Sequence, residues 1–220
     1  MKKNKIFAVI PAYNEEKRII PVIEKAKKFV DSVVVVDDGS RDRTQEFAKS
    51  AGAIVLRHLV NLGKGAALKT GCDYASEHAE WIIVLDADAQ HNPEDIPRFI
   101  EKLKKYDIVF SYRSLSSKMP AVLRFGNKMI SMSISALYGI NLKDSQCGFR
   151  AFSNGTYKKI RWDAQDYSME SEMIARAGKQ KLKYVQVPIK TLYSDNYKGT
   201  TILDGIKIFW NMVWWKISSR

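Results

Sequence analysis

Residues 81–90 join a short apolar run to two closely spaced aspartates and read Trp81-Ile82-Ile83-Val84-Leu85-Asp86-Ala87-Asp88-Ala89-Gln90. The β-branched and aromatic first half is typical of a buried strand. Side chains at positions i, i+2 and i+4 of an extended chain point the same way, so Asp86, Asp88 and Gln90 are predicted to present oxygen atoms together. Ligands bind at the carboxyl edge of open α/β sheets, and oxygen ligands favour Mg²⁺ or Mn²⁺. The stretch therefore predicts a metal site, with a solvated acidic turn as the alternative.

Outward from this stretch, strand-like and helix-like segments alternate. The predicted strands are Lys5–Ile10, Ser32–Val36, Ala53–Leu56, Trp81–Leu85, Asp107–Ser111 and Tyr184–Val187. The predicted helices are Glu15–Phe29, Thr44–Ser50, Gly65–His78 and Pro93–Lys105. Such alternation implies right-handed crossovers and an α/β fold with a mainly parallel sheet flanked by helices. It stops after Ser111, where substrate-specific elaboration is expected.

The composition restricts the size of the fold and its partners. A chain of 220 residues with 45% hydrophobic content suits one domain, alone or with an appendage. Its net charge of +12 implies an anionic partner, which can be nucleic acid, a membrane surface or a phosphorylated substrate. The apolar run Ile6–Ile10 is too short for a signal peptide and no run could span a bilayer, so a cytoplasmic protein is expected. Cys72 and Cys147 are expected to be reduced, and the three scattered histidines do not support a zinc site or a Ser-His-Asp triad.

Two segments have features of lipid-contacting helices. Residues 113–143 contain five basic and no acidic residues, and Phe125–Tyr138 within them is rich in Met, Ile and Ser. A helix lying against lipid and an ordinary packed helix fit this segment equally well. Near the C-terminus, Trp210, Trp214 and Trp215 lie beside lysines, which is typical of an interfacial anchor. The apolar residues Ile202, Ile206, Phe209, Val213 and Ile217 recur there at helical spacing, and the alternative is a terminal helix docked on the core.

Polar loops follow the first two predicted strands, at Pro11-Ala12-Tyr13-Asn14-Glu15-Glu16 and at Asp37-Asp38-Gly39-Ser40. Alone, each is only a capping sequence, but at adjacent strand ends they form the expected floor of a nucleotide site. A third turn, Asn61-Leu62-Gly63-Lys64-Gly65, opens a predicted helix and lacks the Walker A and dinucleotide signatures. Lys64 in this turn can contact a diphosphate or simply be solvated.

Four motifs occur in order over residues 11–91: Pro-Ala-Tyr-Asn-Glu, Val-Asp-Asp-Gly-Ser-x-Asp-x-Thr, Asn-x-Gly-Lys-Gly and Asp-Ala-Asp-x-Gln-His. Together they resemble the inverting family 2 glycosyltransferases, which have the GT-A (nucleotide-diphospho-sugar transferase) fold. Ser111-Tyr112-Arg113, Cys147-Gly148-Phe149-Arg150 and Val187-Pro188-Ile189 narrow the resemblance to the polyprenyl-phosphate hexosyltransferases. Residues 86–94 are similar to the dolichyl-phosphate mannose synthases, whereas residues 144–149 look more like the glucose synthases. The donor sugar therefore stays open.

The resemblance covers about residues 5–200 and implies a domain organisation. Residues 1–200 would form the GT-A domain, with a nucleotide-binding half at about 1–91 and an acceptor half at about 92–200. An amphipathic, Trp-rich C-terminal helix would follow at residues 201–220. Some members carry a transmembrane tail that this chain lacks, so it is expected to reach the cytoplasmic face of the membrane peripherally or through a membrane-anchoring partner protein.

The resemblance also implies site residues. The nucleotide would be held by Pro11, Tyr13, Glu15, Asp37 and Asp38, and Mg²⁺ or Mn²⁺ by Asp86, Asp88 and Gln90. The acceptor phosphate would meet Arg113 and Arg124. Lys64 and Asp86 are predicted to belong to the nucleotide-sugar site. Lys128, from the segment 113–143 that contains no acidic residue, is predicted to belong to the acceptor site. Asp88 and Arg113 are the predicted catalytic residues.

The predicted reaction is metal-dependent transfer of a hexose, with inversion, from a GDP-mannose or UDP-glucose type of donor to a polyprenyl (dolichyl) phosphate. A phosphate monoester has a second pKa of ~6 and needs no base to attack, only cations that hold it near the donor. The first alternative is a sugar hydroxyl acceptor, which needs a carboxylate base such as Asp144, Glu170 or Glu172. The second, a basic nucleic-acid-binding protein, leaves the paired acids at the strand ends unexplained, so no nucleic-acid partner is expected.

Overall fold

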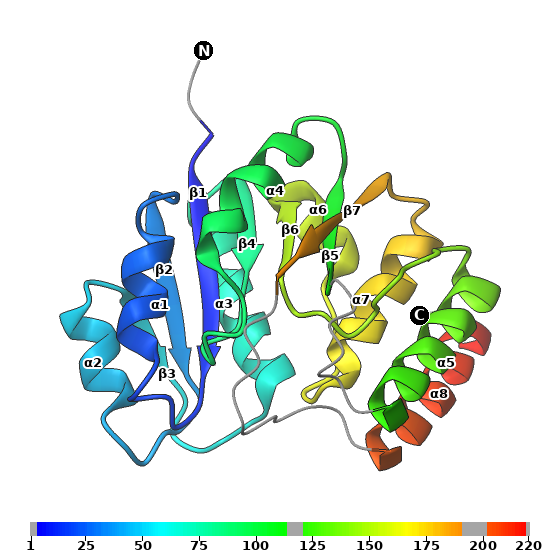
Figure 1. The fold of residues 1–220 in the computed structure, drawn as a ribbon, viewed down its shortest axis with the longest axis horizontal. Helices are drawn as coiled ribbons and strands as arrows, with labels where there is room; N and C mark the ends of the chain where they lie inside the picture. Colours follow the sequence, from blue (N-terminus) through cyan, green and yellow to red (C-terminus); the bar gives the residue numbers. More distant parts are fainter. Residues whose placement is uncertain (1–3, 114–120, 191–201, 219–220) are drawn as a thin grey trace.

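The computed structural model describes residues 4–113, 121–190 and 202–218, and only the backbone of helical residues 121–125 and 202–206. Its centre is a seven-stranded sheet in the order β3-β2-β1-β4-β6-β5-β7 (Figure 1). The strands are β1 (Ile6–Ala12), β2 (Ser32–Asp37), β3 (Ile54–Arg57), β4 (Trp81–Val84), β5 (Ile108–Arg113), β6 (Arg150–Ser153) and β7 (Tyr184–Ile189). The predicted mainly parallel sheet is confirmed.

One strand, β6, runs against the others and was not predicted. Ala151 pairs antiparallel with Ile83 of β4 and with Val109 of β5, so β6 joins the two parts of the sheet. Because β6 is reversed, the chain that enters it, residues 147–149, lies at the same edge as the exit of β4. This places the Cys147-Gly148-Phe149-Arg150 motif beside Asp86.

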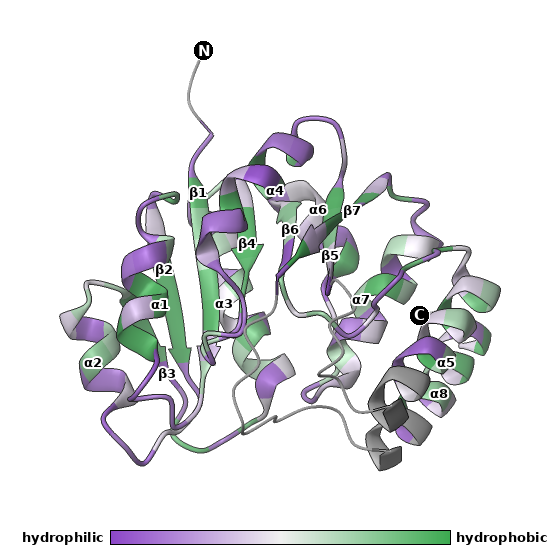
Figure 2. Cartoon of the chain, viewed as in Figure 1, coloured by the Kyte–Doolittle hydropathy of each residue, from purple (hydrophilic) through white to green (hydrophobic). Residues whose placement is uncertain are grey.

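Helices cover both faces of the sheet. One face carries α1 (Ile19–Ala26), α2 (Thr44–Ser50) and, after a short 3₁₀ turn at Pro93–Asp95, α4 (Ile96–Leu103). The other carries α3 (Lys64–His78), α5 (Ala121–Tyr138), α6 (Asn154–Ile160), α7 (Ser168–Lys179) and α8 (Ile202–Ile217). Ala8 and Ile10 of β1 face the first layer, whereas Phe7 and Val9 face the second, as strand alternation requires. Figure 2 shows the apolar strands between helices of mixed hydropathy.

The C-terminal helix α8 lies beside α5 and packs on α7 at one end of the molecule (Figure 1). Its buried side chains are Ile208 and Met212, and the backbone carbonyl of Met212 accepts a 2.6 Å hydrogen bond from the hydroxyl of Tyr138. Of the apolar series at helical spacing, Val213 is half-buried, whereas Phe209 is 42% exposed and Ile217 is 74% exposed. The helix packs on the core through the side that carries Ile208 and Met212, and it leaves large apolar side chains outside.

Candidate active site

A cleft of about 310 Å³ opens at the carboxyl edge of the sheet, where β1, β2 and β4 end. Its walls contain seven of the predicted site residues: Pro11, Tyr13, Glu15, Asp38, Lys64, Asp86 and Asp88. The remaining lining residues are Ala12, Arg18, Asn61, Gly63, Ala67, Ala87, Asp166 and Tyr167. Residues more than a hundred positions apart therefore meet in one concave site, as nucleotide sites of open α/β sheets do.

The first wall of the cleft is the loop after β1. Asn14 has a left-handed backbone (φ 54°), and its Oδ1 accepts a hydrogen bond from the Arg41 backbone N–H at 2.9 Å. The next backbone N–H, that of Glu15, donates to Thr44 Oγ1 at 2.8 Å, and the Glu15 carboxylate pairs with Arg18 at 2.6 Å. These contacts tie the loops after β1 and β2 together and leave Tyr13 projecting into the cleft, 39% exposed.

The two aspartates at the end of β2 have different surroundings. Asp38 lines the cleft, but its carboxylate accepts the backbone N–H groups of Leu62 and Gly63, both at 2.9 Å, and contacts His58 Nδ1 at 2.7 Å. Asp37 is fully buried and does not line the cleft. Its Oδ1 accepts a hydrogen bond from the Ser40 backbone N–H, and Arg57 Nε lies 3.4 Å from its Oδ2. Both side chains therefore hold the loops that shape the cleft.

The aspartates after β4 lie on a turn, because β4 ends at Val84 and Ala89 has a positive φ of 61°. The Gln90 backbone N–H donates to Asp88 Oδ1 at 3.0 Å, and the Gln90 side chain is buried and does not line the cleft. The strand-alternation argument that grouped Gln90 with the aspartates is thus wrong. Burial and the neighbouring charge of Asp86 raise the pKa of Asp88. Burial acts on Asp86 too, but the charges of Lys64 and His91 outweigh it and lower the pKa of Asp86.

Lys64, the first residue of α3, is not a solvated lysine. Its Nζ lies 2.8 Å from Asp86 Oδ1 and 2.9 Å from Glu170 Oε1. Burial disfavours the ammonium, but the charges of Asp86 and Glu170 outweigh it and raise the pKa of Lys64. Lys64 therefore stays charged at the floor of the cleft.

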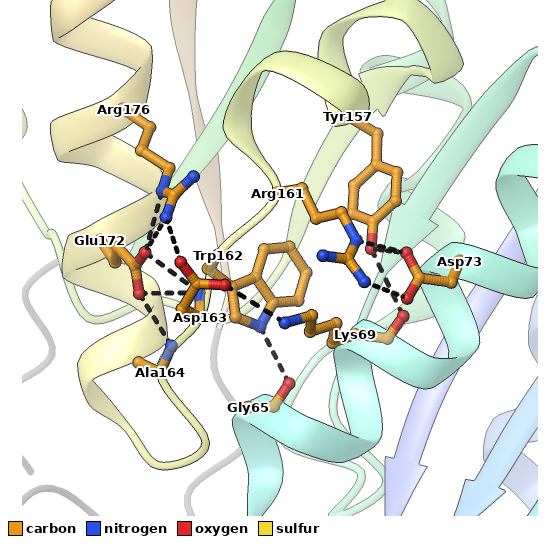
Figure 3. Close-up of polar contacts among 10 residues, drawn as sticks. All are labelled: Gly65, Lys69, Asp73, Tyr157, Arg161, Trp162, Asp163, Ala164, Glu172 and Arg176. Carbon is orange, nitrogen blue, oxygen red and sulfur yellow. Dashed lines mark hydrogen bonds and ion pairs between the residues drawn. The ribbon is translucent and has the colours of Figure 1, made fainter. Parts of the chain in front are cut away.

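The N-terminus of α3 is occupied by the protein itself. The carbonyl oxygen of Gln165 accepts hydrogen bonds from the backbone N–H groups of Gly65 and Ala66, at 2.7 and 3.2 Å. Trp162 Nε1 donates to the Gly65 carbonyl at 2.9 Å, as Figure 3 shows. A Cβ on Gly65 would lie 2.4 Å from the Ala164 carbonyl oxygen. The glycines of this turn therefore allow the segment 162–167 to lie against α3, and these two N–H groups are not free for a diphosphate.

A network of ion pairs holds the same segment from behind (Figure 3). The Glu172 carboxylate accepts the backbone N–H groups of Asp163 and Ala164, at 2.8 to 3.1 Å, and pairs with Arg176 at 2.6 Å. Arg176 also contacts the Asp163 carboxylate at 2.8 Å. Asp166 and Tyr167, the cleft-lining ends of the segment, are thereby fixed in place.

At the end of β5, Arg113 forms a two-point ion pair with Asp144, with Nε–Oδ2 at 2.6 Å and Nη2–Oδ1 at 3.0 Å. Burial opposes ionisation of Asp144, but the hydrogen bonds and charge of Arg113 lower its pKa. Arg113 does not line the cleft, yet its charge contributes to the lowered pKa of Asp86. Lys128 is exposed on α5, and Arg124 belongs to the same helix but its side chain lies outside the described residues.

The donor set at the cleft floor fits a divalent cation. Asp86 and Asp88 offer carboxylate oxygens close enough together that the charge of Asp86 raises the pKa of Asp88, and Glu170 Oε2 is buried without a hydrogen-bond partner among the described residues. The described parts of the chain contain no cluster of three His, Cys, Asp or Glu side chains that could hold a metal alone. Mg²⁺ typically takes one or two carboxylates and completes its shell with water and substrate phosphates, so two aspartates are enough.

The lining residues outside the predicted site include two charged residues and one aromatic residue: Arg18, Asp166 and Tyr167. Arg18 could have been found from its i,i+3 spacing to Glu15, which allows an ion pair at a helix start. Asp166 and Tyr167 had no such signal, because they follow a helix that the sequence did not predict.

The model of a known family, Glycosyl transferase family 2, matches residues 7–161. The chain belongs to this family. It is therefore a glycosyltransferase, and the four motifs of residues 11–91 that carried the resemblance lie within the matched residues. An uncharacterized protein of Methanocaldococcus jannaschii is 39% identical, with 99% of this chain and 94% of the relative covered. The UDP-N-acetylglucosamine–dolichyl-phosphate N-acetylglucosaminyltransferase of Methanococcus voltae is 33% identical, with 96% of each chain covered.

Solved structures confirm the fold of this glycosyltransferase. Glucosyl-3-phosphoglycerate synthase of Mycobacterium tuberculosis, in complex with Mn²⁺, UDP-glucose and phosphoglyceric acid, superposes with a TM-score of 0.75. The alignment covers 95% of this chain and 79% of that one, at 21% identity. The predicted GT-A fold is confirmed.

Proposed function

We propose that this family 2 glycosyltransferase transfers a sugar, with inversion, from a nucleoside-diphosphate sugar to a polyprenyl phosphate at a membrane surface. The M. voltae relative, similar along nearly its whole length, is named for transfer to dolichyl phosphate. That name includes the donor UDP-N-acetylglucosamine, which should therefore be tested together with GDP-mannose and UDP-glucose.

One observation supports a phosphate acceptor over a hydroxyl acceptor: each carboxylate considered as a base is already engaged by a cation. Asp144 pairs with Arg113, Glu170 with Lys64, and Glu172 with Arg176. A hydroxyl acceptor must lose a proton to such a base, whereas a polyprenyl phosphate attacks without one. The site therefore offers cations where the hydroxyl reaction would need a free carboxylate.

The lining residues then have separate roles. Pro11, Tyr13, Glu15, Asp38 and Lys64 bind the nucleotide sugar. Asp86 and Asp88 would hold Mg²⁺ or Mn²⁺, which offsets the negative charge that develops on the departing nucleoside diphosphate. Gln90 supports this site through its backbone N–H, which donates to Asp88 Oδ1. Asp37 supports it by accepting the Ser40 backbone N–H, which holds the turn that carries Asp38.

The acceptor phosphate is bound by cations at the end of β5 and on α5. Arg113 is held in one orientation by Asp144, and a guanidinium is the side chain best suited to paired hydrogen bonds with phosphate oxygens. Lys128 and Arg124, four residues apart on α5, add charge on the same helix. Cations in these positions offset the repulsion between the acceptor phosphate and the donor diphosphate.

The lipid is reached at a surface formed by α5 and α8. The outer side of α8 exposes Phe209, Trp210, Trp214 and Ile217, and α5 exposes Met129 and Met132. Exposed lysines at 128, 207 and 216 accompany them, and tryptophan with lysine is typical of interfacial helices. None of the helices in the described parts of the chain is long and apolar enough to cross a bilayer. We therefore assign peripheral binding, at the anionic cytoplasmic leaflet, with or without a membrane-anchoring partner protein.

A radiolabelled transfer assay tests the proposal. Each of the three donors is offered with a long polyprenyl phosphate, with a short water-soluble prenyl phosphate, or with free sugars, in the presence of Mg²⁺ or Mn²⁺. The expected product is a lipid-extractable, mild-acid-labile phosphosugar formed from one donor. Transfer to free sugars and none to either prenyl phosphate would overturn the proposal in favour of the hydroxyl acceptor.

A further inference from the structure

Three charged side chains from distant parts of the chain meet under the cleft. Lys64 comes from the start of α3, Asp86 from the turn after β4, and Glu170 from the first turn of α7. The ammonium lies 2.8 Å from one carboxylate and 2.9 Å from the other, so it is shared almost equally. The Glu170 side chain is only 4% exposed, whereas that of Asp86 is 22% exposed and faces the cleft.

The glycine at position 148 makes room for these three side chains. A Cβ on Gly148 would lie 2.7 Å from Asp86 Oδ2 and 3.1 Å from Lys64 Nζ, so a larger residue there would displace the ion pair. At the observed distances the ammonium is held by both Asp86 and Glu170.

Lys64 is the cation that Asp86 and Glu170 share at hydrogen-bond distance. Other positive groups act on these carboxylates from further away: His91 Nδ1 lies 3.8 Å from Asp86 Oδ2, and the charge of Arg113 also acts on Asp86. Arg150 is buried nearby and its charge interacts with Glu170, but its N–H groups donate to the carbonyl oxygens of Cys147, Ser145 and Glu170 and to the Met173 sulfur. Among the residues that the structure describes, Glu170 Oε2 has no hydrogen-bond donor. The Glu170 carboxylate therefore depends on Lys64 for its close cation contact.

We propose that Glu170 is a positioning residue, which shares the ammonium of Lys64 so that Asp86 keeps enough negative charge to bind a divalent cation. Without Glu170 the ammonium belongs to Asp86 alone and competes with the cation for the same carboxylate. The inference rests on the proposed function, because it assumes a metal-dependent donor site, and it gives Glu170 a role other than that of a base.

The substitution Glu170→Gln tests this role, since it removes the charge and keeps the shape. Mn²⁺ binding is measured by electron paramagnetic resonance with UDP or GDP present, and binding of the nucleotide alone by calorimetry in EDTA. We expect Mn²⁺ affinity to fall about tenfold, because a buried charge within a few ångströms acts strongly on a cation. Nucleotide binding in EDTA should stay the same or strengthen, since one repelling charge has gone.

Glu172→Gln is the matched control. Glu172 lies two residues further along the same helix and is equally buried, but its partners are Arg176 and the backbone of residues 163–164, away from the cleft floor. This variant should lower the unfolding temperature and leave Mn²⁺ affinity unchanged. A purely structural role for Glu170 would make the two variants behave alike.

A second pair of variants keeps the test decisive if Glu170→Gln unfolds. Lys64→Met should destabilise the protein because it leaves two buried carboxylates without their cation, and Lys64→Met with Glu170→Gln should recover most of the loss. The double variant should bind Mn²⁺ at least as tightly as Glu170→Gln, because Asp86 is then free of the ammonium. Wild-type Mn²⁺ affinity in Glu170→Gln, or an equal loss in Glu172→Gln, would overturn the inference.

The outcomes separate this inference from the proposed function. Failure of the wild type to bind Mn²⁺ with either nucleotide would overturn both the inference and the metal-dependent donor site. The predicted contrast between Glu170→Gln and Glu172→Gln, found together with no transfer to any prenyl phosphate, would overturn only the acceptor.

Discussion

The carbonyl oxygen of Gln165 accepts a 2.7 Å hydrogen bond from the backbone N–H of Gly65, although the two residues come from opposite halves of the chain. The contact caps α3 with the loop between α6 and α7 and sets the spacing between Lys64 and the wall at Asp166 and Tyr167. The absence of a side chain at position 65 makes the contact possible, because an added Cβ would meet the Ala164 and Gln165 backbone at 2.4 and 2.8 Å.

Gly65→Ala should therefore destabilise the protein by about 1–3 kcal/mol, through overpacking against backbone that cannot move aside. It should also weaken binding of nucleoside diphosphates, since the cleft wall is displaced. Urea unfolding and calorimetry measure the two effects. Gly126→Ala on α5 is the control: a Cβ there meets nothing within 4 Å, and replacing a mid-helix glycine should stabilise by about 0.5–1 kcal/mol. A Gly65→Ala protein as stable as the wild type would refute this account of the turn.

Asp88→Asn should keep the fold and reduce turnover by about two orders of magnitude or more, because a metal ligand loses its charge and a divalent cation contributes several kcal/mol to such a reaction. EDTA should silence the wild type, and Mg²⁺ or Mn²⁺ should restore it. The transfer assay measures both effects, and full activity of the wild type in EDTA would show that the reaction needs no metal.

Arg113→Lys should raise the KM for the acceptor about tenfold, since lysine retains a charge beside Asp144 but loses the paired donors of a guanidinium. The affinity for the donor nucleotide, measured by calorimetry, should stay nearly unchanged. Arg113→Ala is a harsher test, because it leaves Asp144 buried without its cation and should cost about 3–5 kcal/mol of stability. Collapse of donor binding in Arg113→Lys would place Arg113 in the donor site.

The membrane surface can be tested on α8 with two variants. Trp210 and Trp214 are 65% and 66% exposed, so changing both to Ser should release the protein from anionic liposomes with little loss of stability. Transfer to a long-chain polyprenyl phosphate should slow, and transfer to a short soluble one should persist. Trp215 packs partly against the core, so Trp215→Ser should instead lower the unfolding temperature. Equal liposome binding by the double variant and the wild type would rule out this surface.

Much of the fold was predictable because the first half of the chain follows simple rules. Helix α2 spans Thr44–Ser50 as predicted, and the predicted strands before residue 112 differ from the observed ones by one or two residues at their ends. Apolar β-branched runs bounded by charge leave little ambiguity in a parallel sheet buried on both faces. The seven site residues that line the cleft could be predicted for the same reason, because they follow strands or open a helix.

The second half was harder because polar residues occupy its core. Helix α7 buries Ser168, Glu170, Ser171 and Glu172, so it lacks the apolar periodicity from which a helix is recognised. Strand β6 is four residues long and begins with Arg150, which is 2% exposed and satisfied by backbone carbonyls. The partners of Lys64 and Arg113 could not be read from the chain, because each ion pair joins residues that only the folded sheet brings together.

The reversed strand β6 also affects how the protein is made. During synthesis, β4 is complete roughly 65 residues before β6, which is a delay of about 3–13 s at typical elongation rates. Over that interval the four N-terminal strands present an unpaired β4 edge, which invites association with other nascent chains. We therefore expect the nascent chain to be most prone to association before residues 150–153 leave the ribosome and β6 pairs with β4.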